Sequence, residues 1–341
     1  MGTITIGTSA LDGADTERMR EAGIEWVRQG FPLPFEDRLG GKPTEAYEQA
    51  KARTRDWARK GFGVMGVTPL PGICRMEPDE RGKLKIVWHS RMPDWMGPVG
   101  GEQYVANYRA VCHWLGEDLA ELVSLWQIAN ELDIVEFAGP LNPRQACDLI
   151  AAAARGLKAG NAAAPVGTNT ASSDKAYYLY GRLFAQPDCP LDYCGVDAYY
   201  GTWLPGGPDD WGARIEELHA LTGVPVLINE WGFSSAGEAM SLEERTSGVY
   251  CCQIRKWRYT WAGGHNPEGQ ADYVRTAFEA FSRHRDILLG SFFYRWEDQQ
   301  QCWQCGSPDC PVETAWGLVD REGRPKPSFH AFQEGVVALA G

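Results

Sequence analysis

The sequence of 341 residues contains no run of about 18 consecutive apolar residues, the length that a membrane-spanning helix needs. It also has no excess of positive charge, because 33 lysine and arginine residues stand against 45 aspartate and glutamate residues and give a formal net charge of −12. An acidic surface repels phosphate backbones and anionic lipids. We therefore expect neither a nucleic acid nor a membrane as a partner, and a neutral substrate fits this charge better.

Motifs of several other enzyme classes are missing as well. No glycine-rich phosphate loop follows the first predicted strand, which argues against a dinucleotide-binding fold. No HExxH motif or spaced set of histidine and aspartate occurs, so the sequence predicts no catalytic metal and no cofactor. No Gly-x-Ser-x-Gly elbow is present to supply the nucleophile of an esterase.

A secretory signal pattern is also missing from the start of the sequence. The chain opens with Met1 and Gly2 and enters a predicted strand at once, without a charged segment followed by an apolar one. As written, this predicts a cytoplasmic protein. A secreted protein from which a signal peptide had been removed would give the same sequence, so localisation stays open.

The ten cysteines do not decide between these compartments. Cys302, Cys305 and Cys310 form a CxxC-x4-C cluster, and Cys251 and Cys252 are adjacent. The cluster has the spacing of a zinc knuckle but no obvious fourth ligand nearby. A disulfide, free thiols and structural zinc all remain open. We expect the cluster to support the wall of the cleft and not the chemistry, because it follows strand eight but lies beyond Trp296.

What the sequence does contain is a regular alternation of strands and helices. Short runs rich in valine, isoleucine and tyrosine end in polar residues and are followed by helical stretches. Eight such units in order predict a closed parallel (β/α)8 TIM barrel forming a single catalytic domain over residues 1–341. The predicted strands are Thr3–Thr8, Ile24–Gly30, Gly63–Pro69, Leu125–Glu131, Pro165–Thr170, Tyr193–Tyr200, Pro225–Gly232 and Gly290–Asp298.

The predicted connections after strands three, seven and eight are long. They cover Leu70–Gly100, Phe233–Asn266 and Gln299–Arg324, and they carry six of the 14 tryptophans. In this fold the active site lies where the strands end, and long loops in compact domains usually serve function. We therefore expect these three loops to form the walls of a cleft.

Two glutamates occupy equivalent places on opposite strands. Glu131 ends predicted strand four after Asn130, and Glu230 lies at the end of predicted strand seven. Strands four and seven face each other across an eight-stranded barrel, so both carboxyl groups should enter its mouth. A pair about 5–5.5 Å apart can cleave a glycosidic bond with retention, because one carboxyl group protonates the leaving oxygen while the other attacks the anomeric carbon.

Asn130-Glu131 on strand four together with Glu230 on strand seven resembles the clan A glycoside hydrolases, the retaining β-glycanases and β-glycosidases, over essentially the whole barrel. This resemblance to family 5 and its neighbours implies that Glu131 is the acid/base and Glu230 the nucleophile. It implies that Asn130 donates to the sugar 2-hydroxyl. Arg28, at the end of strand two, resembles the arginine that keeps the nucleophile ionised.

Further positions resemble the sugar-binding residues of the same clan. Tyr199 resembles the strand-six tyrosine that contacts the nucleophile, and Trp296 resembles the strand-eight tryptophan beneath the sugar. Trp231, next to Glu230, is expected to bind substrate too. Asp197 could bind a sugar hydroxyl or make a structural hydrogen bond.

The sequence departs from family 5 at three places. It reads Asn-Glu-Leu where Asn-Glu-Pro is usual, and Asp197 and Thr68-Pro69 stand where histidines are frequent. The catalytic pair is unaffected, but these positions contact sugar hydroxyls, so the sugar, the linkage and the family stay open. The sequence thus predicts a retaining hydrolase of β-linked oligo- or polysaccharides, with a transglycosylase or a carbohydrate-binding barrel without turnover as alternatives.

Overall fold

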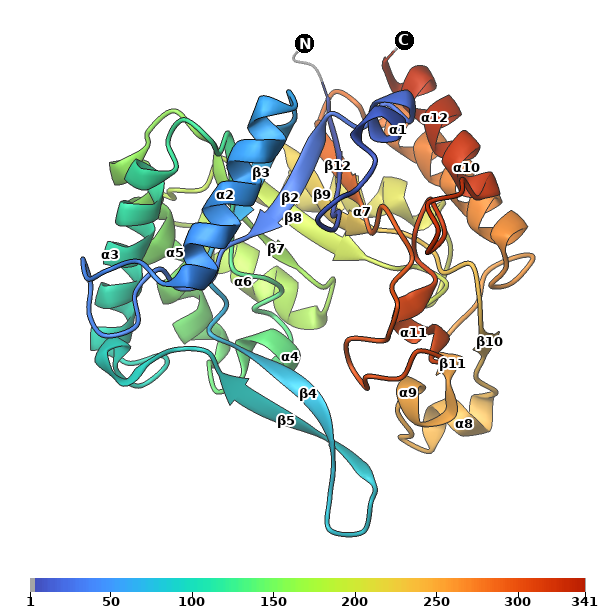
Figure 1. Ribbon diagram of the computed structural model, residues 1–341, viewed down its shortest axis with the longest axis horizontal. Coiled ribbons are helices and arrows are strands. Elements are labelled where there is room, and N and C mark those ends of the chain that lie inside the picture. The colour runs from blue at the N-terminus through green and yellow to red at the C-terminus, as the bar shows by residue number, and fades with distance from the viewer. Residues whose placement is uncertain (1–3, 341) are drawn as a thin grey trace.

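The computed structural model describes residues 4–340. Within this range eight parallel strands close into a barrel, and helices surround it (Figure 1). The strands follow one another around the ring in the order β1 (Thr5–Thr8), β12 (Leu288–Phe293), β9 (Val226–Trp231), β8 (Tyr193–Ala198), β7 (Val166–Thr170), β6 (Leu125–Ile128), β3 (Gly63–Val67) and β2 (Trp26–Gly30). The predicted (β/α)8 barrel is therefore confirmed.

Each predicted strand corresponds to one barrel strand, but several end earlier than the sequence suggests. The largest differences are in β6, which ends three residues before Glu131, and in β12, which ends at Phe293. Thr3, the first residue of the first predicted strand, lies outside the described residues. The early ends matter because the candidate site lies just beyond them.

The helices that cover the barrel begin where local sequence favours a start. Asn142 caps helix α5 (Pro143–Gly160) in a capping box with Gln145, and Pro143 occupies the first helical position. The other long helices are α2 (Glu45–Arg59), α3 (Glu102–Asp118), α6 (Asp174–Phe184), α7 (Asp210–Thr222), α10 (Pro267–Arg283) and α12 (Pro327–Ala340), and α1 (Thr16–Glu21) is shorter. Among the described residues no helix is both long and apolar enough to cross a lipid bilayer.

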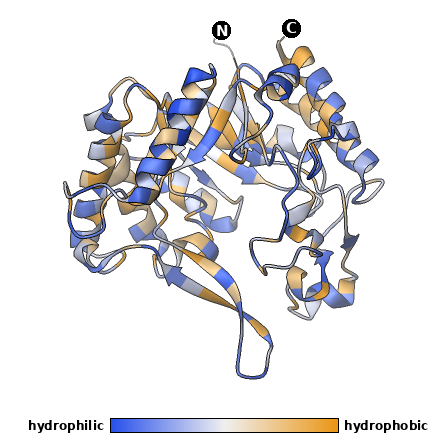
Figure 2. Cartoon of the chain, viewed as in Figure 1, coloured by the Kyte–Doolittle hydropathy of each residue, from blue (hydrophilic) through white to orange (hydrophobic). Residues whose placement is uncertain are grey.

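Two apolar layers hold the barrel together. Inside it, buried side chains from five strands fill the end away from the site; they are Met65, Leu125, Tyr193, Leu227 and Phe292. Outside it, the large core lies between the strands and the surrounding helices. Figure 2 shows hydrophobic residues along the strands and hydrophilic residues at the tip of the β4–β5 hairpin.

The three long connections contain short elements of their own. The segment after β3 forms the antiparallel hairpin β4 (Gly72–Pro78) and β5 (Leu84–Ser90) and the 3-10 turn η1 (Asp94–Met96). The segment after β9 holds β10 (Glu238–Ala239), α8 (Leu242–Thr246), α9 (Cys251–Ile254) and β11 (Lys256–Trp257), and that after β12 holds α11 (Pro311–Thr314). The connection after β6 holds α4 (Val135–Ala138). In Figure 1 the hairpin extends from one side of the barrel and α8, α9 and α11 lie together on the other.

Candidate active site

Glu131 sits on a sharp turn and not on a strand. After β6 ends at Ile128, both Ala129 and Glu131 adopt left-handed backbone conformations, with φ of 49° and 44°. Such conformations are unfavourable for residues other than glycine and are frequent at functional sites. This turn carries the Glu131 side chain into the mouth of the barrel.

Side chains from neighbouring strands hold this turn in place. Thr68, just beyond β3, accepts a hydrogen bond from the Ala129 amide at 2.8 Å. Gln127 donates to the Ala129 carbonyl at 2.7 Å, and Asn169 of β7 accepts from the Glu131 amide at 3.1 Å. The polar groups of the turn are thus satisfied although it is buried, which allows the unfavourable conformation to persist.

Glu230 reaches the barrel interior because strand β9 contains a β-bulge. On the side of β8 the register moves from Val196–Ile228 to Asp197–Glu230, so β9 carries one extra residue there. Asn229 points inward, where it donates to Gln127 Oε1 at 2.9 Å. Because of the extra residue, Glu230 also faces the interior, whereas strict alternation would turn it outward.

Two donors converge on the Glu230 carboxylate. Arg28 Nη1 lies 2.6 Å from Glu230 Oε1, and the Tyr199 hydroxyl donates to Oε2 at 2.5 Å. Burial and the charge of Glu230 raise the pKa of Tyr199, so its hydroxyl stays protonated and able to donate. These two contacts fix the orientation of the Glu230 carboxyl group.

The same arginine also orients Asn130. Arg28 Nη2 donates to Asn130 Oδ1 at 2.6 Å, and Asn169 Nδ2 donates to the same oxygen at 2.9 Å. With its oxygen bound by these donors, the Asn130 amide nitrogen has no hydrogen-bond partner among residues 4–340 and borders the cavity. It is placed to donate a hydrogen bond to a ligand.

Glu131 differs from Glu230 in its electrostatic surroundings. Burial first, and then the charges of Glu230 and Asp133, raise the pKa of Glu131 well above its usual range. Burial, and then the charges of Glu230 and Glu131, likewise raise the pKa of Asp197. One carboxyl group is therefore paired with a cation while the opposite one favours its protonated form, an arrangement suited to a nucleophile and an acid.

Asp197 is buried beside these two glutamates. Its Oδ2 accepts from Asn169 Nδ2 at 2.5 Å, while its Oδ1 has no hydrogen-bond partner among the described residues. Asp197 borders the cavity. It therefore makes the structural hydrogen bond that the sequence allowed, while its second oxygen is buried without a partner among residues 4–340.

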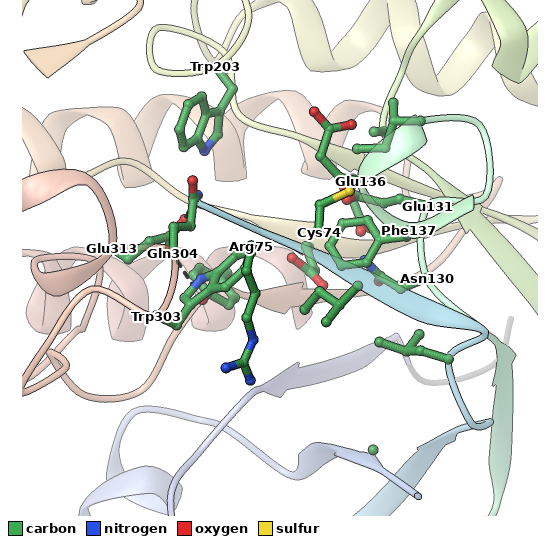
Figure 3. Close-up of a pocket in the computed structure, with 18 of the residues that line it drawn as sticks. Cys74, Arg75, Asn130, Glu131, Glu136, Phe137, Trp203, Trp303, Gln304 and Glu313 are labelled. Carbon is green, nitrogen blue, oxygen red and sulfur yellow. Dashed lines mark hydrogen bonds between the residues drawn. The ribbon is translucent and has the colours of Figure 1, made fainter. Parts of the chain in front are cut away.

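One cavity of about 1220 Å³ lies at the end of the barrel and is bordered by Glu131, Glu230, Arg28, Asn130, Asp197 and Tyr199. Its walls come from the hairpin and α4 on one side and from the segments after β8, β9 and β12 on the other. Figure 3 shows Trp203, Trp303, Gln304 and Glu313 across the pocket from Glu131, Glu136 and Phe137. A cavity with apolar walls and a few polar groups at its base is typical of a small-molecule or oligomer site.

Two predicted substrate-binding residues lie elsewhere. Trp231 is fully buried outside the barrel, where its ring lies 5.4 Å from Phe278 and 6.2 Å from Phe332, because the bulge that turns Glu230 inward returns the next residue outward. Trp296 is 2 % exposed and packs against Phe329 of α12, because β12 ends before it and the chain has already turned away. Neither residue borders the cavity, so both expectations were wrong.

Other aromatic residues border the cavity next to Glu230. Tyr294 directly follows β12, and Trp316 comes from the segment after it; their rings lie 6.0 Å and 5.0 Å from that of Tyr199. Sequence reasoning did not assign either to the sugar site. The alternation Phe292, Phe293, Tyr294 could have indicated that Tyr294 shares the inward side of Phe292.

The cysteine cluster has the fourth member that the sequence did not reveal. Cys252, from the segment after β9, lies next to Cys302, Cys305 and Cys310 from the segment after β12. The sequence showed no obvious fourth ligand near the three cysteines, and the folded chain brings one from another segment. Fifty residues separate Cys252 from Cys302 in sequence, which is why spacing alone could not connect them.

Comparison with known proteins identifies the fold. No protein-family model matches the sequence, and no curated protein matches it. Among solved structures, the GH53 catalytic domain of Ignisphaera aggregans has a TM-score of 0.61 and 18 % identity over 96 % of this chain and 90 % of that one. The two chains share the (β/α)8 barrel fold.

Two more solved structures show the same similarity. GH5_18 from Streptomyces cattleya, solved in complex with GlcNAc, gives a TM-score of 0.67 and 15 % identity over 99 % of this chain and 80 % of that one. The GH10 xylanase of Thermobacillus composti gives a TM-score of 0.61 and 17 % identity over 97 % of this chain and 96 % of that one. The resemblance inferred from the two glutamates is thus confirmed at the level of fold.

Proposed function

We propose that this chain is a single-barrel retaining glycoside hydrolase that cleaves β-linked oligo- or polysaccharides, with Glu230 as nucleophile and Glu131 as acid/base. The observation that carries the proposal is the contrast between the two carboxyl groups. Glu230 is bound by Arg28 and Tyr199, whereas burial and nearby negative charge favour the protonated form of Glu131. Retention further requires the two carboxyl groups to stand about 5–5.5 Å apart.

In the first step, Glu230 attacks the anomeric carbon and forms a glycosyl-enzyme while Glu131 gives its proton to the leaving oxygen. In the second step, Glu131 removes a proton from water, which releases the sugar. The free amide nitrogen of Asn130 would bind a sugar hydroxyl beside the reacting carbon, and Asp197, which borders the same cavity, would bind another. Tyr294, in place of Trp296, offers an aromatic surface to the ring, and the buried Trp316 packs against Tyr294.

The decisive experiment uses an activated aryl glycoside and azide. Glu131→Ala should still form the glycosyl-enzyme, because a good leaving group needs little protonation. Without a base to activate water the intermediate should accumulate, and azide should restore turnover with a β-glycosyl azide as product. Glu230→Ala should lose the first step by several orders of magnitude, and azide could rescue it only by direct attack, which gives the α-anomer.

Glu279→Ala on the exposed side of α10 serves as the control and should keep full activity. If Glu131→Ala gave the α-azide and Glu230→Ala the β-azide, Glu131 would be the nucleophile and Glu230 the acid/base. Full activity of both active-site variants would place the site elsewhere. Sizing the products with and without acceptor sugars separates hydrolysis from transglycosylation, and binding of a glycan panel without turnover by the intact protein would favour a carbohydrate-binding barrel.

A further inference from the structure

The segments that follow β9 and β12 meet through four cysteines. Cys252 lies in α9, and Cys302, Cys305 and Cys310 lie between β12 and α11. Figure 1 shows α9 and β11 beside α11, although the two segments are far apart in the chain. Three of the four side chains are buried and that of Cys305 is half-buried.

The sulfur atoms form a compact group in which no pairing stands out. All four Sγ atoms lie within 4.8 Å of one another, and Cys252 Sγ lies 3.9 Å from Cys302 Sγ. Zn–S bonds of about 2.3 Å place the sulfurs of a tetrahedral site about 3.8 Å apart. Two disulfides would instead bring the sulfurs together in two pairs at about 2.05 Å.

The surroundings of the cluster offer little other stabilisation. The elements within the two segments are short: β10, α8, α9, β11 and α11 contain between two and five residues each. Their apolar residues form a small core separate from the barrel core; its buried members are Met240, Cys251, Cys252, Trp257, Cys302, Cys310, Val312 and Trp316. Small cores with little regular structure usually need a disulfide or a metal to stay folded.

We infer that Cys252, Cys302, Cys305 and Cys310 form a closed tetrathiolate site for a structural zinc ion. Four sulfur ligands and the absence of an open position are typical of structural and not catalytic zinc. Each thiol gives up its proton when the ion binds, so one Zn²⁺ and four thiolates leave a site of net charge −2. The ion would fasten the segment after β9 to the segment after β12.

The same site would position part of the cavity wall. Trp303 and Gln304 lie between the ligands Cys302 and Cys305, and both border the cavity. Gln304 Nε2 donates to Glu313 Oε1 at 2.8 Å, and Glu313 also borders the cavity. Zinc would therefore hold Trp303 and Gln304 in place at the cavity wall, without contacting the reacting carboxyl groups itself.

The first test measures metal and thiols on the whole purified protein. We expect one zinc per chain by elemental analysis, and ten thiols that react with Ellman's reagent after unfolding in a chelator. The reduced metal-free protein should bind one Co²⁺ and show the charge-transfer and d–d absorption of a tetrahedral tetrathiolate. Disulfides among the four cysteines, bound iron in place of zinc, or no tetrathiolate spectrum on adding Co²⁺ would overturn the assignment.

The second test uses matched cysteine variants. Cys252→Ser should lose the bound metal, whereas Cys251→Ser, one residue away and outside the cluster, should keep it. Cys305→Ser, at the half-buried ligand, provides a further variant in case Cys252→Ser does not fold. Loss of zinc from Cys251→Ser with retention in Cys252→Ser would contradict the site.

The third test asks whether the metal positions the cavity wall. Removing zinc from the folded wild-type protein should lower its melting temperature and raise the KM for an oligosaccharide about tenfold, with little change in kcat. Cys189→Ser, remote from both loops, is the control for stability and activity. An unchanged KM in the metal-free protein would refute the positioning role. The metal and thiol measurements do not depend on turnover, so they stand even if the proposed hydrolase activity fails.

Discussion

Arg28 and Glu230 form an ion pair with 2.6 Å between Nη1 and Oε1, and each side chain is only 12 % exposed. Removing one partner of such a pair leaves the other charge buried without compensation, which typically costs about 3–5 kcal/mol. Arg28→Met should therefore destabilise the protein by about this amount and should lower kcat strongly, because Glu230 and Asn130 each lose one of their donors.

Chemical denaturation and kinetics on the folded fraction measure the two effects. Lys60→Met is the matched control, because Lys60 pairs with Asp56 at the surface with exposed fractions of 40 % and 56 %. Exposed pairs contribute about 0–1 kcal/mol. If both variants changed stability and kcat equally little, Arg28 would not support Glu230.

The pH dependence should reflect the raised pKa of Glu131. The acid form is needed to protonate the leaving oxygen, so kcat/KM should fall as pH rises through that pKa. The fall should be steep for an aryl glycoside with a poor leaving group and weak for one with a good leaving group. An equal fall for both substrates would show that another group limits the reaction at high pH.

The contribution of Glu131 to the stability of the fold should also fall as pH rises. A carboxyl group whose pKa is higher in the folded than in the unfolded chain binds its proton more tightly when folded. Its contribution is therefore complete below the unfolded value of about 4.3 and is lost as pH rises through the folded value. Glu131→Gln should flatten this part of the stability profile, which thermal unfolding across a pH series can measure.

Thr68 should matter for catalysis although it does not react. Thr68→Val removes the acceptor of the Ala129 amide and leaves a buried N–H unpaired, which costs about 1–3 kcal/mol. The turn that carries Glu131 should relax, so kcat should fall with a smaller change in KM. Thr54→Val is the control, because Thr54 is buried too but bonds only to Ala50 within helix α2. An unchanged kcat in the Thr68 variant would show that the turn holds its shape without this bond.

The tryptophans should divide into structural and substrate-binding ones. Trp231→Ala should cost about 3–5 kcal/mol of stability and leave the KM of the folded fraction unchanged, because its ring lies in the core. Trp303→Ala should cost little stability, since Trp303 is 39 % exposed. It should raise KM, because the substrate would lose roughly 1–3 kcal/mol of binding free energy from the aromatic contact. The reverse pattern would contradict the observed placement.

The barrel and the glutamate pair could be predicted from sequence because they depend on periodicity. Eight alternating units specify the closed sheet, and a polar residue at the end of an apolar strand indicates the mouth. The positions of Trp231 and Trp296 could not be predicted, since a β-bulge and an early strand end change which side chain faces inward. Contacts such as Thr68 with Ala129, or Cys252 with Cys302, join segments that only the folded chain brings together.

The left-handed turn at Ala129 and Glu131 has a consequence for how the protein responds to heat. Its shape depends on Thr68, which directly follows β3, on Asn169 of β7 and on Gln127 of its own strand. A transient separation of β6 from either neighbour would release the turn into an ordinary extended conformation while most of the barrel stays closed. Activity should therefore fade several degrees below the temperature at which the circular dichroism of the helices is lost, and should return on cooling.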